Sequence, residues 1–152
     1  MLARYLDTHG RVMAVLRDRS LAPRAAVEGA LCQSAAMQTG DGHPPGCLVV
    51  LATTVASPDN AHLQALLAAE RDGNQAALRA RVEEAIAAAD LQAKTPASAL
   101  ATMFDSFLVG LTTQARDDVS HQALDEAVTQ IMAVWNLHAT GDRPEAQPIE
   151  RR

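Results

Sequence analysis

Apolar residues recur in steps of three and four along most of the chain, which is the spacing of one face of an α-helix. The first stripe covers residues 2–16. The second begins near Pro23, since proline is tolerated in a first helical turn, and should stop at Thr39-Gly40. Two better-defined stripes cover residues 95–116 and 120–135. The pattern predicts an all-α domain of about six helices.

The run at residues 47–56 is ambiguous, because its valines and threonines favour a strand by propensity. Periodicity alone cannot separate a short buried strand from a buried helix. No second strand candidate is present to pair with it, and an isolated strand would leave its backbone groups without partners. We therefore expect a buried helix here, after a loop at residues 40–46 that is crowded with glycine and proline.

A long helix is expected from the turn Ser57-Pro58-Asp59 to about Leu91. Gly73 lies inside it, and glycine costs about 1 kcal/mol relative to alanine within a helix, so we expect a bend or break there. The next helix begins with Thr95 as N-cap and Pro96 in the first turn, and Ser120 caps the last one. The domain is thus predicted to cover residues 1–138, and the proline-containing, charged residues 139–152 to form a disordered tail.

Composition narrows the class of protein. Hydrophobic residues make up 48% of the chain but aromatic residues only 3%, which favours closely packed helices over a β-sandwich. The net charge is −5 and Lys94 is the single lysine, so we expect no nucleic-acid binding by this chain itself. There is no apolar stretch of about 18 residues and no signal peptide, so we expect a cytoplasmic protein without membrane contact. The arginines among the first 24 residues are interpreted as solvated helix faces.

Several features occur in a particular order along the chain. The block Gly46-Cys47-Leu48 opens the expected buried helix, an Asp-containing turn at residues 57–60 opens the long one, and Ala115-Arg116-Asp117 ends the next to last. Taken together, over roughly residues 1–137, they resemble the regulatory half of a TetR/AcrR-type transcriptional repressor. That family commonly has glycine after the Ala-Arg-Asp triplet, where this chain has Asp118. Because aspartate tolerates the left-handed conformation better than most residues, we expect the turn to survive.

The resemblance implies a domain that senses a small hydrophobic effector and forms a homodimer. In such repressors a DNA-binding helix-turn-helix precedes this domain, and none is found before the first stripe here, which starts at Leu2 without a capping residue. DNA binding is therefore expected only through the missing N-terminal part of a longer parent protein.

The resemblance also implies two sets of residues. The effector pocket would be lined by Met37, Cys47, Leu51, Leu66, Met103, Phe104 and Phe107. The dimer interface would be formed by Leu108, Leu111, Leu124, Val128, Ile131 and Trp135. Adaptable thioethers and stacking rings suit an apolar ligand, and the stripes on the last two helices are broad enough for an interface. Two alternatives stay open: both stripes could face only the core of their own domain, and Met and Phe at helical spacing are more often core residues than pocket linings.

Catalytic and metal chemistry has little support. Asp41, His43 and Cys47 are potential ligands or a Cys-His pair, but a structural zinc site needs four ligands and no second cluster completes one. We expect no cofactor, no metal and no enzymatic activity. Two other functions remain as alternatives: a truncated dimerisation module that titrates a full-length relative, and a small helical enzyme using Cys47 or His43.

Overall fold

The protein is described by a computed structural model that covers residues 13–42, 44–51 and 58–141. The described elements, in chain order, are α2 (Ala14–Arg17), α3 (Pro23–Gln38), α4 (Leu48–Leu51), the 3-10 turn η3 (Pro58–Asn60), α5 (Ala61–Ala87), α6 (Ala97–Arg116) and α7 (His121–His138). Within these ranges the only β-type pairing is an isolated bridge between Leu91 and Ala139. The prediction of an all-α fold is confirmed.

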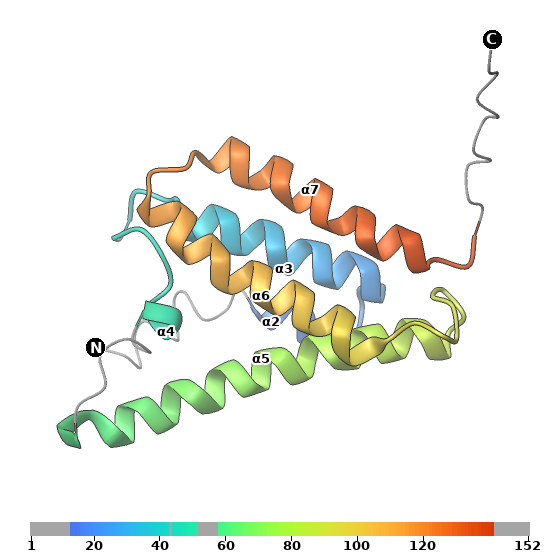
Figure 1. The fold of residues 1–152 in the computed structure, drawn as a ribbon, viewed down its shortest axis with the longest axis horizontal. Helices are drawn as coiled ribbons and strands as arrows, with labels where there is room; N and C mark the ends of the chain where they lie inside the picture. Colours follow the sequence, from blue (N-terminus) through green and yellow to red (C-terminus); the bar gives the residue numbers. More distant parts are fainter. Residues whose placement is uncertain (1–12, 43, 52–57, 142–152) are drawn as a thin grey trace, which may run out of the picture.

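Helices α7, α3, α6 and α5 lie roughly side by side along one long direction, with α2 behind them (Figure 1). Their apolar faces meet in a core in which Phe104 of α6 is fully buried. Its ring contacts that of Trp135 on α7, with a centroid distance of 6.2 Å and a tilt of 38°. The stripe at residues 95–116 therefore packs mainly on α5 and α3 and the stripe at residues 120–135 mainly on α3, with a smaller contact between the two.

Helix α5 runs through Gly73 without interruption, so the prediction of one long helix is confirmed and there is no break at this residue, while the bend stays a prediction. It ends at Ala87, earlier than the expected Leu91. The amides of Asp90 and Leu91 both donate to the carbonyl of Ala85, at 2.9 and 3.1 Å, and Ala89 adopts a left-handed φ of 61°. These bonds satisfy a terminal carbonyl that the helix itself leaves open.

The two predicted helix starts have different outcomes. Ser120 caps α7, since its Oγ accepts a hydrogen bond from the amide of Ala123 at 3.2 Å. Thr95 does not cap α6: the helix begins at Ala97, Pro96 occupies the N-cap position, and the buried Oγ1 of Thr95 has no partner among the described residues. The turn at Asp118 survives as expected, with a left-handed φ of 59°.

Order extends slightly beyond the predicted end of the domain. Thr140 donates from its amide to the carbonyl of Asp90 at 3.1 Å and from Oγ1 to that of Ala89 at 2.5 Å. The amide of Gln92 donates to the carbonyl of His138 at 2.8 Å. Residues 138–140 thus bond to the loop after α5, the domain boundary at His138 stays a prediction, and residues 142–152 of the predicted tail lie outside the described part. Residues 2–12 and 52–56 of the predicted helices also lie outside it.

Candidate effector and dimerisation sites

Gly46 determines how the loop after α3 reaches α4. Its φ is +98°, a left-handed conformation, and its amide donates to the carbonyl of Gln38 at 3.2 Å. A Cβ at this position would lie 3.1 Å from Cγ2 and 3.3 Å from the carbonyl oxygen of Thr112. Only glycine combines this backbone conformation with so close an approach to α6. The first residue of the Gly-Cys-Leu block is therefore explained by backbone geometry.

A buried polar pair lies beneath this loop. Thr112 and Gln38 are 1% and 3% exposed, and the Thr112 hydroxyl donates to Oε1 of Gln38 at 2.8 Å. A buried hydroxyl or amide without a partner would destabilise the core, so the pair constrains how α6 aligns with α3. The sequence analysis did not identify it, because each residue is an ordinary polar position within its own helix.

Helix α4 packs against α5 and α6. Val49 is buried, and its carbonyl accepts a hydrogen bond from Nη1 of Arg71 at 3.0 Å. Leu67 of α5 is fully buried, yet both Leu67 and Val49 lie outside the main core cluster. The described part of α4 is thus helical, as expected, and contacts the N-terminal half of α5 through one polar and several apolar groups.

The predicted effector residues are not gathered at one place. Phe104 is sealed in the core, whereas Leu66 and Met103 are each 42% exposed. Phe107 is partly buried at the edge of the core and lines a groove between α6 and α7. Met37, Cys47 and Leu51 are partly buried. Helical spacing predicted apolar positions on α6 correctly, but not which neighbour each one meets.

The groove between α6 and α7 opens on the outer surface and has a volume of about 360 Å³. Its floor includes Leu111 and Leu124, which are 2% and 3% exposed. Apart from one glutamine, the other lining residues are apolar or small. They are Phe107, Gly110, Gln114, Val119, Ala123 and Ala127. Small side chains at Gly110, Ala123 and Ala127 leave the backbones of both helices accessible to a partner.

The predicted interface residues mostly belong to the core of their own domain. Five of them are at most 9% exposed and are part of the main core cluster: Leu108, Leu111, Leu124, Val128 and Trp135. Ile131 is partly exposed at the edge of that cluster. A second copy could therefore contact the groove but not most of these side chains. The small residues that line the groove were overlooked because they do not stand out in a hydrophobic stripe.

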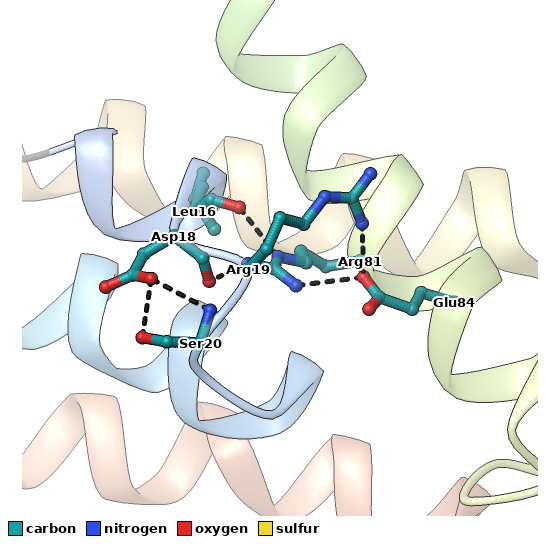
Figure 2. A network of polar contacts seen from close by, with 6 residues as sticks. All are labelled: Leu16, Asp18, Arg19, Ser20, Arg81 and Glu84. Carbon is teal, nitrogen blue, oxygen red and sulfur yellow. Dashed lines mark hydrogen bonds and ion pairs between the residues drawn. The ribbon is translucent and has the colours of Figure 1, made fainter.

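Arg81 of α5 is a further residue that the sequence analysis missed. Its side chain is 2% exposed, and every nitrogen of its guanidinium has a partner (Figure 2). Nε donates to the carbonyl of Leu16 at 2.6 Å, Nη2 donates to the carbonyl of Asp18, and Nη1 pairs with Oε2 of Glu84 at 2.9 Å. The same Glu84 oxygen accepts from Nη1 of Arg19 at 2.9 Å. This group, which we call the Arg81 junction, attaches residues 16–19 to α5.

Burial shifts the pKa of two described side chains upward, those of Cys32 and Asp105. Burial raises the pKa of the Cys32 thiol, and the neighbouring carboxylates of Asp125 and Glu28 add to the effect, so this thiol is kept protonated. Burial also raises the pKa of Asp105 on α6. Among the described residues no three His, Cys, Asp or Glu side chains are close enough to hold a metal ion, and His43 is outside the described part. No described helix is long and apolar enough to cross a membrane.

Comparison with known proteins agrees with this architecture. Residues 23–131 match the family described as the tetracyclin repressor-like C-terminal domain, so the match extends from the start of α3 into α7. The chain is also similar to two solved cysteine mutants of the TetR family transcriptional regulator CifR, both complexed with 26-bp double-strand operator DNA. Each is 36% identical with a TM-score of 0.77, and the match covers 88% of this chain and 70% of the regulator. No match was found among curated proteins. This chain belongs to the TetR family of transcriptional regulators and contains its C-terminal regulatory domain.

Proposed function

We propose that this domain senses a small hydrophobic effector and forms a homodimer through the outer faces of α6 and α7. The observation that carries the dimerisation part of the proposal is the groove between these helices, whose small and apolar lining above the buried floor reaches the surface of the isolated chain. In this proposal the groove is covered by the same faces of α6 and α7 in a second copy of the chain. A two-fold interface of this kind uses one surface patch twice.

The dimensions of the two helices are adequate for such an interface. Helix α6 has 20 residues and α7 has 18, which makes each about 27–30 Å long. A standard interface buries approximately 800 Å² per partner, so the contact would have to extend from the groove at residues 107–127 along both helices. Ile131 and Val134 are partly buried residues of α7 that would extend the contact beyond the groove.

Sedimentation velocity of matched variants tests dimerisation. Ala127→Glu places a charge in the groove, so we expect monomers in place of dimers with little change in the free energy of unfolding of the protomer. Ala133→Glu places the same charge on an exposed position of α7 away from the groove and should leave dimers intact. Dimers that persist in Ala127→Glu would exclude the groove as the interface.

For the effector, we propose a site between α4, α5 and α6. Support comes from the packing of α4 on both longer helices and from Val49 of α4 and Leu67 of α5, which are buried but do not belong to the main core cluster. A thermal-shift screen with small hydrophobic compounds should find ligands, since one at 100 times its dissociation constant stabilises by about 2.7 kcal/mol. Leu67→Phe should weaken the shift by filling space beside α4, whereas Leu137→Phe, at a residue that is 73% exposed, should not. An equal shift in both variants would place the ligand elsewhere.

DNA binding in this proposal depends on residues beyond this chain. The solved relatives are complexed with operator DNA, and the match leaves 30% of each relative uncovered. The net charge of −5 makes phosphate binding by this domain alone unfavourable.

A dimerisation module that titrates a full-length relative would use the same groove, and mixed dimers with such a relative would support it. For the enzyme alternative, activity would have to be lost in Cys47→Ala without loss of folding.

A further inference from the structure

Asp105 is the one acidic residue within α6. It follows Ala101 by four residues and precedes Thr112 by seven, so the three lie on one face of the helix. Ala101 lines a hollow against α5, and a Cβ at Gly46, just before α4, would lie 3.1 Å from Cγ2 of Thr112. Phe107, which lines the groove against α7, is two residues from Asp105 and therefore about 200° around the helix. Asp105 thus lies on the side of α6 that faces α5 and the α4 region.

This side of α6 leads from the hollow to α4. The hollow has a volume of about 260 Å³ and is lined from α5 by Asp72 and Arg79. Helices α5 and α6 run antiparallel (Figure 1), so α6 beyond Ala101 passes the N-terminal half of α5, which α4 also contacts. Asp105 lies one turn beyond the hollow in this direction. It is therefore placed between the hollow and α4, in the region proposed above for the effector.

Asp105 has no counter-ion among the described residues, and none of the described ion pairs includes it. Arg71 of α5 donates instead to the carbonyl of Val49 at 3.0 Å. Arg79 pairs with Glu83 at 2.7 Å. Burial raises the pKa of Asp105, whereas a cation close by would lower it. The ionised carboxylate has thus lost part of its hydration without gaining an opposite charge.

Apolar surface lies next to this carboxylate. Val109 follows Asp105 by one turn of α6 and is 41% exposed. Leu48 of α4 is 38% exposed, and α4 packs on α6 as well as on α5. Covering such side chains with an apolar ligand would be favourable. A carboxylate beside apolar surface suits a ligand in which a positive charge is attached to an apolar body.

We propose that Asp105 binds a positively charged group of the effector, which is therefore a hydrophobic cation such as an amine with an apolar body. This inference rests on the effector site proposed between α4, α5 and α6. The bound cation would supply the counter-ion that the described fold does not provide, and the pair would be stronger here than on an open surface because the carboxylate is partly removed from water. The apolar body would cover Val109 and Leu48.

Calorimetric titration of the full chain with two probes tests the charge preference. The probes are 4-phenylbutylamine, which is protonated at neutral pH, and 4-phenylbutanol, which has the same carbon skeleton without the charge. The amine should bind about tenfold more tightly than the alcohol, since a hydrogen bond to a charged partner is stronger than a neutral one. Asp105→Asn should abolish this preference by weakening the amine alone. An unchanged affinity for the alcohol would show that the site itself is intact.

Asp117→Asn is the matched control, because it removes the same charge at an exposed residue directly after α6. It should keep the preference for the amine. Equal binding of the two probes to the unmodified chain, or a preference that survives in Asp105→Asn, would overturn the inference and leave the effector site standing. Binding of neither probe, or binding that Leu67→Phe does not weaken, would contradict the effector site and the inference with it.

Discussion

The Arg81 junction and the groove between α6 and α7 bury their groups in opposite ways. At the junction a charged side chain is enclosed by its own chain, and each nitrogen has an acceptor. At the groove the apolar floor is buried, but the small and partly exposed residues along its sides leave apolar surface open to solvent. The comparison teaches that a saturated polar contact defines the shape of the domain, whereas unsatisfied apolar surface marks where a partner can bind.

Replacing Arg81 should change the free energy of unfolding more than any other substitution, because the guanidinium makes several buried hydrogen bonds at the junction. Arg81→Leu leaves the Leu16 and Asp18 carbonyls without this donor and the Glu84 carboxylate with Arg19 alone, and should lower the free energy of unfolding by about 3 kcal/mol. Urea denaturation measures the change. Arg79→Leu removes only an exposed ion pair and should cost less than about 0.5 kcal/mol. Equal losses in the two variants would contradict a special role for the buried guanidinium.

Truncating Leu124 in the floor of the groove tests whether this residue stabilises the protomer without a partner. Leu124 is 3% exposed and belongs to the core cluster, so Leu124→Ala should destabilise the protomer by about 2–3 kcal/mol even when it is monomeric. This should be measured in the Ala127→Glu background, where dimers are not expected. Leu137→Ala, at a residue that is 73% exposed, should have little effect. A negligible loss at Leu124 would mean that the floor is stabilised mainly by a partner.

A substitution at Gly46 tests whether the loop before α4 is packed closely against α6. Gly46→Ala places a Cβ 3.1 Å from Thr112 in a left-handed conformation and should cost about 2 kcal/mol in thermal or urea unfolding. Gly42→Ala is the control, because no atom lies within 4 Å of a Cβ at that position. If the two variants were equally stable, the loop would not be pressed against α6 as the structure indicates.

A substitution at Asp105 should change the free energy of unfolding least. Unlike Arg81, Asp105 is a partly buried charge with no ion-pair partner among the described residues. Burial raises its pKa above the ordinary 3.8, so the folded protein binds the proton more tightly than the unfolded chain. Its unfavourable contribution is absent below the unfolded pKa and develops as pH rises through the folded pKa. Asp105→Asn should therefore stabilise the protein at neutral pH, by less than about 1 kcal/mol because the carboxyl is partly exposed.

The pKa of Asp18 is shifted in the opposite direction to that of Asp105, so its contribution to stability changes with pH in the opposite sense. Hydrogen bonds from the hydroxyl and the amide of Ser20 lower its pKa, so its favourable contribution is present above the ordinary value of 3.8 and is lost as pH falls through the folded pKa. The stabilisation by Asp105→Asn should disappear at acidic pH. A benefit that is the same at all pH values would show that burial of the charge is not its cause.

The sequence predicted the helices well, and their contacts less well. Hydrophobic spacing and capping at Ser120 located α6 and α7, because both signals are local to the helix. Thr95 failed as a cap because its side chain turned into a buried position beside Pro96. Gly73 did not interrupt α5, because the helix is held on both sides by tertiary contacts whose strength exceeds a propensity of about 1 kcal/mol.

The candidate sites were predicted only in part, since a stripe on a helix specifies an apolar face but not the neighbour that covers it. Phe104 and Phe107 are three residues apart, yet one contacts Trp135 in the core and the other lines the outer groove. Leu111 and Leu124, expected at an interface, form the buried floor of the groove between α6 and α7. Arg81 carried no signal in the sequence, because its partners are carbonyls of residues more than sixty positions away.

What the sequence determined by itself was therefore the all-α class, most helix positions and the family, each of which rests on local periodicity or on an ordered set of short motifs. Only the tertiary structure decided which apolar residues are enclosed and which remain open, and which polar groups meet across the fold. The physical reason is that burial and hydrogen bonding depend on residues brought together from distant positions, and helical spacing carries no information about those partners.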